Sequence, residues 1–174
     1  MALIIVETTA EQPLTSEFLL DAHERVMPCL TVRNAIWRYS LLASDRQRMI
    51  CTFDAPDAES VRESYRQGGV MFSRIWSGTL MKPDGFAPQQ NPALLKVMEA
   101  TYPPLDEDDW RAVNIKTLHC YAESGIEWIQ SYISWKGTKV IYELNAPDLE
   151  SVRQVQAKLG IPWERVWSAA VLKD

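Results

Sequence analysis

The sequence has no concentrated run of lysine and arginine. Its 18 basic residues are outnumbered by 23 acidic ones, which gives a formal net charge of −5 over 174 residues. Proteins that bind nucleic acid or an anionic membrane surface normally present a concentrated basic face. We therefore expect neither nucleic acid nor a membrane among the partners of this protein.

Cysteine is scarce, and signals for secretion are missing. The three cysteines (Cys29, Cys51 and Cys120) are an odd, sparse set that does not resemble a disulfide framework. The opening MALIIVETT has no basic segment, and its apolar run is rich in Ile and Val, so it predicts a strand and not a signal peptide. These features favour reduced thiols and a cytoplasmic location.

The sequence does contain a repeat. APDAESVR at residues 55–62 returns as APDLESVR at 146–153, an offset of 91. Pairs aligned by this offset without a gap include Ala2 with Ala93, Cys29 with Cys120, Trp37 with Trp128, Ser40 with Ser131, Gly69 with Gly160 and Trp76 with Trp167. We interpret the chain as two fused copies of one unit, at residues 1–82 and 92–174, joined by a linker at 83–91 that is rich in proline and polar residues.

Each copy is expected to run strand, helix, strand, strand, helix, strand, which is the ferredoxin-like βαββαβ order. In the first copy the first four elements are expected near 2–9, 16–29, 35–43 and 48–55. A helix that follows Asp57 and stops at Gly69 comes next, and the last strand carries Ile75–Trp76. The fold class is therefore α+β, with two tandem ferredoxin-like units that form an intramolecular dimeric α+β-barrel-like arrangement. Strict alternation along the second strand would place Trp37 and Tyr39 on one face and Ser40 on the other.

Local signals fix several boundaries. The segment 93–100 looks helical by composition, but the repeat aligns it with a strand, and we expect a strand there. The acidic run DEDD at 106–109 is interpreted as a helix cap and not as a metal site. In each APD, proline ends a strand and aspartate (Asp57 or Asp148) caps the next helix, which ends at a glycine.

The chain resembles a family of small ferredoxin-like proteins of unknown function that are described as nickel-responsive. The residues that carry the resemblance in the first copy are Val6–Glu7, Trp37, Ser40, Cys51, Asp54–Ala55–Pro56, Glu59, Arg62, Arg74 and Ile75. Those in the second copy are Val97, Trp128, Ser131–Tyr132, Ala146–Pro147, Glu150, Arg153, Gly160, Pro162, Arg165 and Val166. The resemblance implies nickel binding through histidines, one of them at the C-terminus. This chain departs from that pattern, since it ends in VLKD and has only His23 and His119, and the alignment gives Met98 and Tyr142 where the first copy has Glu7 and Cys51.

A degenerate metal site in the first copy is one hypothesis. His23, Glu7 and Cys51 would supply imidazole, carboxylate and thiolate to Ni or Zn. The alternative for His23 is a histidine at the edge of the core that bonds to water or a carbonyl. The matched cysteines Cys29 and Cys120 fall on apolar helix faces, where packing is the simpler interpretation.

Small-molecule binding is the second hypothesis. Rings and polar groups at Trp37, Tyr39, Trp128, Tyr132 and Glu143 could line a pocket. For Glu143 the alternative is a solvent-facing edge or a cross-strand ion pair, and for the tryptophans it is core packing.

An enzyme is the third hypothesis, by analogy with cofactor-free monooxygenases of the dimeric α+β-barrel type. His23 would act with Glu7 or Glu143 as a partner. The sequence has no CxxC pair, no nucleotide-binding glycine loop and no evident Ser/His/Asp set. We therefore expect a cytoplasmic protein that binds a small molecule or a metal ion, with association into a homodimer also open.

Overall fold

The computed structural model describes residues 1–85 and 88–173, and these residues form two compact α+β units. Unit 1 comprises Met1–Gly78 with Ala170–Asp174, and unit 2 comprises Thr79–Ala169. Positions 86–87 of the predicted linker lie outside the described residues. Among the described residues, no helix combines the length and the apolar character needed to cross a bilayer.

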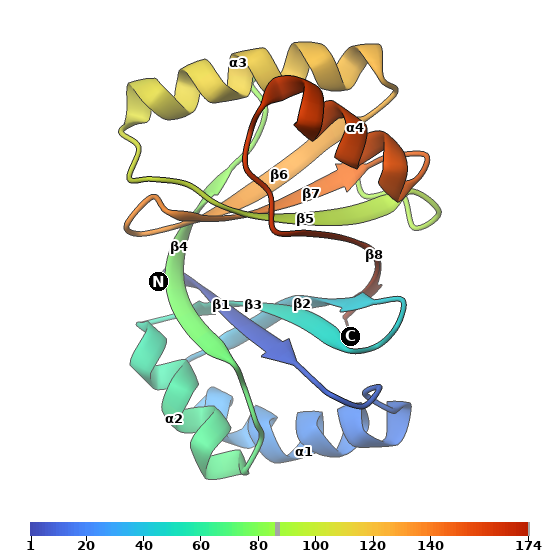
Figure 1. Ribbon diagram of the computed structural model, residues 1–174. Helices are drawn as coiled ribbons and strands as arrows, with labels where there is room; N and C mark the ends of the chain where they lie inside the picture. Colours follow the sequence, from blue (N-terminus) through green and yellow to red (C-terminus); the bar gives the residue numbers. More distant parts are fainter. Residues whose placement is uncertain (86–87, 174) are drawn as a thin grey trace. The chain divides into compact units, whose positions relative to one another are not determined.

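Unit 1 is an antiparallel sheet with two helices on one face (Figure 1). Its elements are β1 (Ala2–Thr9), α1 (Ser16–Val32), β2 (Ile36–Ala43), β3 (Arg48–Ala55), α2 (Ala58–Gly68) and the part of β4 (Arg74–Met81) up to Gly78. The strand order is β4-β1-β3-β2. Apolar side chains of α1, α2 and the sheet, among them Val6, Val26, Leu30, Phe53 and Val61, form the core between the helices and the sheet.

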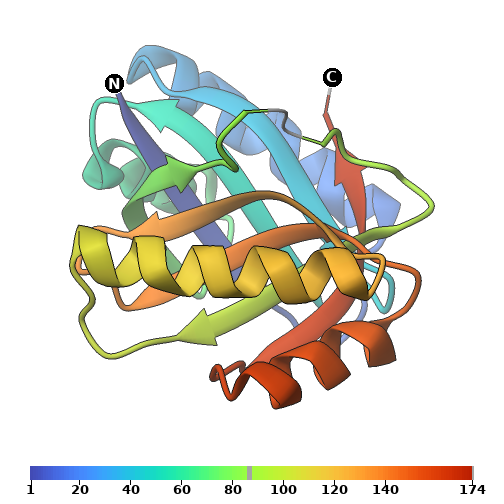
Figure 2. The same ribbon diagram turned by 90° about the horizontal axis from the view of Figure 1, so that it is seen from above.

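Unit 2 repeats this arrangement. Its elements are β5 (Leu95–Thr101), α3 (Glu107–Glu123), β6 (Glu127–Ser134), β7 (Lys139–Asn145), α4 (Leu149–Leu159) and the part of β8 (Arg165–Leu172) up to Ala169. The strand order is β8-β5-β7-β6. Figure 2 shows α3 lying over the sheet of its own unit. The predicted α+β class and the two ferredoxin-like βαββαβ units are confirmed.

The tertiary structure overrides helix propensity in β5. The segment that contains Leu95–Thr101 is rich in helix-forming residues, yet it pairs with β7 on one side and β8 on the other. The predicted strand at 93–100 is confirmed within the usual uncertainty of strand ends. The acidic run before α3 is a capping box: Asp106 accepts from the amide of Asp109, and the Asp109 side chain accepts from the amide of Asp106.

A one-residue shift separates the first strands of the two units. Val6 lies opposite Cys51, and Met98 lies opposite Tyr142, which is the repeat partner of Cys51. Glu7 therefore corresponds to Glu99 and not to Met98. The gap-free alignment over β1 and β5 is wrong, and the loop before α1 is one residue longer than its counterpart before α3.

A bulge in each second strand corrects the predicted faces. In β2 the register shifts between Trp37 and Tyr39, which brings Trp37 and Ser40 onto the same, helix-facing side. Trp37 Nε1 donates to Ser40 Oγ at 3.0 Å. In β6 the same shift lets Trp128 Nε1 donate to Ser131 Oγ at 2.8 Å. The W-x-x-S pattern is therefore the sequence of a β-bulge closed by a side-chain hydrogen bond.

The repeated APD segment works as predicted. Asp57 accepts from the Ser60 amide at 2.7 Å, and Asp148 accepts from the Ser151 amide at 2.7 Å. Both helices end at a glycine in the left-handed region, Gly69 with φ 64° and Gly160 with φ 65°. These amide hydrogen bonds hold the pKa of both aspartates below the usual value.

A double variant, Asp57→Asn with Asp148→Asn, is expected to keep its stability at neutral pH and to lose less of it in acid. Asparagine caps a helix about as well as aspartate but does not titrate. The folded-state pKa of each aspartate is depressed, so its contribution is fully present above the unfolded-state pKa and is lost as pH falls through the folded-state pKa. Urea unfolding midpoints from neutral pH to about pH 3 measure this. Asp84→Asn, at an exposed acid outside the helices, serves as the control; an acid profile identical to that of the parent would contradict the prediction.

Candidate functional site

Unit 1 contains a cavity of about 110 Å³ between α1 and the sheet, with Tyr65 of α2 in its wall. Its lining is mostly apolar and includes Leu19, Val26 and Leu30 of α1 and Phe53 of β3. His23, Ser40, Cys51 and Tyr65 also line it and supply polar atoms. A concave apolar site with a few polar groups is the usual form of a small-molecule site.

A chain of hydrogen bonds runs along one wall of this cavity. Trp37 Nε1 donates to Ser40 Oγ, and Ser40 Oγ donates to Cys51 Sγ at 2.8 Å. Cys51 also hydrogen-bonds with Tyr65. Burial raises the pKa of the Cys51 thiol, although its bonds with Ser40 and Tyr65 oppose the rise, and burial raises the pKa of Tyr65 well above its usual value. Both groups are therefore protonated at neutral pH.

His23 lies beside this wall. It is half-buried on α1, and its ring meets the Trp37 ring edge to face with centroids 5.2 Å apart. His23 lies within the sheet-facing surface of α1, because it is four residues after Leu19 and three before Val26. The structure therefore brings His23, Trp37 and Cys51 to one cavity, as three of the residues that the sequence singled out.

A close contact between helices holds α1 in place over the cavity. A Cβ atom added to Gly68 of α2 would lie 2.9 Å from Val26 Cγ2 and 3.1 Å from the Arg25 carbonyl oxygen. Arg25 Nη1 also donates to the carbonyl oxygens of Gly68 at 2.8 Å and Gly69 at 3.0 Å, so it caps the C-terminus of α2. Glycine is required at position 68 by this approach; unit 2 has the buried Leu159 there.

Unit 2 fills the corresponding region with larger side chains. Where unit 1 has Leu19, Leu30 and Cys51, unit 2 has Trp110, Tyr121 and Tyr142, all buried in one core cluster. The hydroxyls of Tyr142 and Tyr102 bond to each other at 2.8 Å. The two copies therefore share a backbone but differ in this part of the core.

The family model for the nickel responsive protein SCO4226-like proteins matches the chain twice, at residues 4–77 and 97–168. The chain belongs to the nickel responsive protein SCO4226-like family. No curated protein matches the chain in a sequence comparison. Among solved structures, that of SCO4226 from Streptomyces coelicolor A3(2) is 19% identical, covers 42% of this chain and 91% of its own, and has a TM-score of 0.39.

Two further solved structures cover nearly the whole chain. A candidate monooxygenase from Fusobacterium nucleatum subsp. nucleatum is 9% identical, with coverage of 98% and 92% of the two chains and a TM-score of 0.49. A second candidate monooxygenase, from Lactobacillus acidophilus, is 8% identical, with coverage of 99% and 92% and a TM-score of 0.48. At these identities the likeness concerns the fold alone.

The metal set predicted for this SCO4226-like chain is not brought together. Among the described residues, no group of three or more His, Cys, Asp or Glu is placed to hold a metal ion. His23 and Cys51 share the cavity, but Glu7 does not, because Val6 faces the helices and Glu7 is the next residue on the strand. Glu7 is instead 1% exposed and ion-paired with Arg48 at 3.3 Å.

The five predicted ligand-binding residues do not form one site. Only Trp37 lines the cavity; Trp128 is packed in the core of unit 2. Tyr39 is turned to the side of its sheet opposite the helices, since the bulge leaves Ser40 on the helix side. Tyr132 and Glu143 also share the non-helical side of their sheet.

Glu143 does not lie at a solvent-facing edge. It is fully buried and accepts hydrogen bonds from Gln90 Nε2 at 2.6 Å and Tyr132 Oη at 3.1 Å, and one from Gln130. Buried carboxylates need such donors, because burial without hydrogen bonds is costly.

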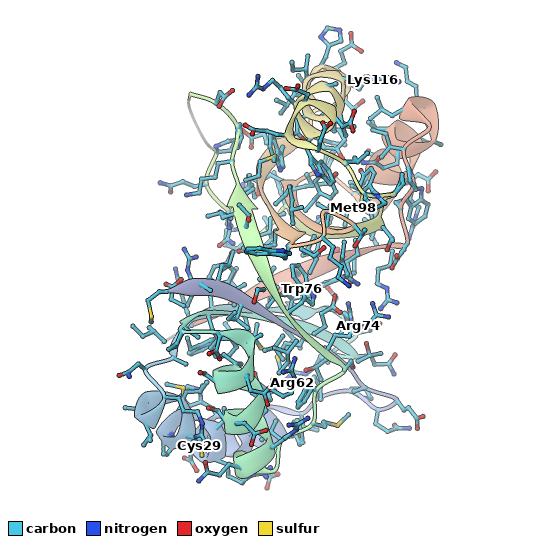
Figure 3. All side chains as sticks on the ribbon, turned by 90° about the vertical axis from the view of Figure 1, so that its left-hand side faces the viewer. Cys29, Arg62, Arg74, Trp76, Met98 and Lys116 are labelled. Atoms are coloured by element: carbon cyan, nitrogen blue, oxygen red, sulfur yellow. The ribbon has the colours of Figure 1, made fainter. Side chains whose placement is uncertain are left out.

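The remaining histidine and cysteines lie elsewhere. His119 is exposed on α3, with Nε2 3.3 Å from Glu123 Oε1. Cys29 lies on α1 (Figure 3), and its thiol donates to the Arg25 carbonyl oxygen at 3.7 Å. Cys29 and Cys120 are both partly buried and free, as packing residues on helix faces would be.

Sequence reasoning missed Met27, Met49 and Tyr65, which also line the cavity. One signal was present: Met27 follows His23 by four residues on α1, and Met49 precedes Cys51 by two on β3, so each pair shares a face. The second copy has Leu118 and Val140 in place of the two methionines. A comparison of the two copies could have identified Met27 and Met49 as cavity residues only after α1 was known to cover β3.

Proposed function

We propose that the protein binds one small, mainly apolar molecule in the cavity of unit 1. One observation carries the proposal: unit 1 leaves a cavity of about 110 Å³ where the second copy of the same fold places three larger aromatic side chains. Natural cores are close-packed, and gaps of this size are few. Ligand binding in a single unit requires this difference, in which the region is filled by side chains in unit 2 and left open in unit 1.

The lining limits the ligand. A dry cavity of about 150 Å³ lined by apolar side chains holds a molecule of the size of benzene. The cavity of unit 1 accordingly suits a single ring or a short branched chain. One hydrogen-bonding group on that ligand could face Ser40 and Cys51, which lie together in the wall.

Binding is a better fit than catalysis. The enzyme hypothesis pairs His23 with a carboxylate of Glu7 or Glu143. Glu7 is turned away from the cavity and paired with Arg48, and Glu143 belongs to unit 2. No carboxylate is among the described residues that line the cavity, so an acid–base pair of that kind has no second member there.

Leu19→Trp is expected to abolish binding in the cavity. Position 19 lies in its wall, and unit 2 carries Trp110 at the matching position. The measurement is NMR of methyl-labelled methionines during titration with toluene and with phenol. In the parent protein the probes should shift the methyl signals of Met27 and Met49 but not that of Met98, which is buried in unit 2 (Figure 3).

The control places the same ring where it cannot fill the cavity. Val32 is 80% exposed at the end of α1, so Val32→Trp should leave the shifts of Met27 and Met49 intact. Unchanged toluene and phenol shifts in Leu19→Trp would contradict the proposal. So would the absence of any shift at Met27 and Met49 in the parent protein.

A further inference from the structure

Sulfur donors gather in the wall of the unit 1 cavity. Met27 on α1 and Met49 and Cys51 on β3 all line it, together with His23. His23 and Met27 are one helical turn apart on the sheet-facing side of α1. Met49 and Cys51 are two residues apart on the helix-facing side of β3, whose register places them opposite Leu42 and Ser40. A helix and a strand therefore each contribute two residues with donor atoms to the lining of one cavity.

This donor set favours a particular kind of metal ion. Thioether and thiolate ligands select Cu(I), whereas carboxylates, carbonyls and water suit harder ions. The described lining holds one imidazole, one thiol and thioethers, and no carboxylate. We propose that the cavity of unit 1 binds a single Cu(I) ion through Cys51, Met27, Met49 and His23. The inference rests on the proposed function, because it uses the same cavity.

Charge points to a monovalent ion. Coordination replaces the proton of the Cys51 thiol, which leaves to solvent, and the copper keeps its oxidation state. The thiolate and Cu(I) then form a neutral pair, which an apolar cavity accommodates. A divalent ion such as Ni²⁺ or Zn²⁺ with this single thiolate would leave one positive charge in a wall that offers no second anionic group among the described residues.

The hydrogen bonds around Cys51 fit a coordinating sulfur. Ser40 Oγ donates to Cys51 Sγ at 2.8 Å, and Trp37 Nε1 holds Ser40 at 3.0 Å. Tyr65 bonds to the same sulfur. Groups that bond to a ligand atom orient it and stabilise its deprotonated form. The Trp–Ser bulge occurs in both units, but in unit 2 it adjoins Tyr142 and not a thiol, so we expect one site per chain.

The test is an anaerobic titration of the full chain with Cu(I), kept reduced by ascorbate and buffered by bathocuproine disulfonate. Cys29→Ser and Cys120→Ser are introduced first, so that no other thiol competes. The expected result is one Cu(I) per chain, with the methyl signals of Met27 and Met49 shifted and that of Met98 unchanged. Ag(I), which has the same charge and softness but no redox chemistry, should give the same pattern.

Variants assign the ligands. Cys51→Ser is expected to remove Cu(I) binding, and Met27→Leu and Met49→Leu are each expected to weaken it at least about ten-fold. Met98→Leu is the matched control, the same replacement at a fully buried methionine of unit 2, and should leave the affinity unchanged. Ser40→Ala should weaken binding by about 10- to 100-fold, through the orientation of the thiolate.

The outcomes separate this inference from the proposed function. If toluene shifts Met27 and Met49 while Cu(I) and Ag(I) neither bind there nor displace toluene, the copper site is wrong and the apolar site stands. If neither toluene, phenol nor Cu(I) moves these methyl signals, both are wrong. Cu(I) bound with unchanged affinity in Cys51→Ser, or Ni²⁺ bound at these methionines in place of Cu(I), also overturns the copper site.

Discussion

Replacing Tyr121 with leucine is expected to lower the free energy of unfolding of unit 2 by about 3 kcal/mol. Tyr121 is 1% exposed in the core of unit 2, and Gln156 Nε2 donates to its hydroxyl. Leucine removes ring atoms that the surrounding core cannot fully replace. It also removes the hydroxyl that accepts from the Gln156 amide. That amide is itself 1% exposed, and its Oε1 has no hydrogen-bond partner among the described residues.

The two causes of this loss can be separated. Tyr121→Phe keeps the ring and removes only the hydroxyl, so it measures the effect of leaving the Gln156 Nε2 donor without its acceptor. We expect this to lower the free energy of unfolding by about 1 to 3 kcal/mol. Adding Gln156→Met to Tyr121→Phe removes both polar partners and should recover most of that loss. Urea unfolding with fluorescence and far-UV circular dichroism measures all three proteins. Equal stability of Tyr121→Phe and the parent would show that the hydroxyl bond contributes nothing.

The copy in unit 1 provides the reciprocal test. Leu30→Tyr places in unit 1 the ring that unit 2 has at Tyr121, next to Tyr65 and not to a glutamine. Leu30 lines the cavity, so the extra ring has space to enter it. The variant should be less destabilised than Tyr121→Leu, and it should lose the toluene response. A large loss of stability with an intact toluene response would mean that the ring does not enter the cavity.

The repeat predicts much of the fold because its signals are local. A proline that ends a strand, an aspartate that caps a helix, and a glycine that ends it act within a few residues. Asp57, Asp148, Gly69 and Gly160 therefore have the predicted roles. The repeat also predicted a strand at β5 against its helix propensity, and this prediction is confirmed, since matching segments of two copies adopt the same secondary structure.

The errors come from single-residue shifts. A strand has a period of two, so one inserted residue moves every following side chain to the other face. The bulge after Trp37 and the longer loop before α1 are both of this kind. Because the bulge was not foreseen, Ser40 was predicted on the wrong face of the sheet. Because the longer loop was not foreseen, the equivalence of Glu7 and Glu99 was missed. Chance matches at Ala2 and Ala93 supported a gap-free alignment that the strand register does not have.

The candidate site was only partly visible for a different reason. His23 and Cys51 stood out because the second copy has no histidine or cysteine at the matching positions, and Trp37 stood out as an aromatic residue. All three line the cavity. Met27 and Met49 look like ordinary core residues until α1 is placed over β3. Glu7 stood out as a possible metal ligand within the Val6–Glu7 motif, but a carboxylate in that position can equally form a structural ion pair. Arg48, with which Glu7 forms an ion pair, is 41 residues away in sequence and lies on the neighbouring strand.

Arg48→Met is expected to destabilise unit 1 by about 3 to 5 kcal/mol, since it removes the guanidinium from a buried carboxylate. Arg48 Nη2 lies 3.3 Å from Glu7 Oε1, and the side chains of Arg48 and Glu7 are 10% and 1% exposed. Arg48 Nη1 also donates to Thr9 Oγ1 at 2.7 Å. An equivalent ion pair occurs in unit 2 with lysine in place of arginine, where Lys139 Nζ lies 3.6 Å from Glu99 Oε1. A carboxylate opposed by a cation at the same place in both units is part of the architecture.

A double-mutant cycle decides whether Glu7 has this structural role. Glu7→Gln removes the buried charge at nearly constant volume, so Glu7→Gln with Arg48→Met should be more stable than Arg48→Met alone, by about 1 to 3 kcal/mol. Lys139→Met is the matched variant in unit 2. It should lose less stability than Arg48→Met, because Glu99 also accepts from Trp167 Nε1 at 2.9 Å and lies 3.8 Å from Arg165 Nε. Denaturant unfolding supplies the four free energies of the cycle. If Glu7→Gln and Arg48→Met simply add, the two side chains are not coupled, and Glu7 would need another explanation.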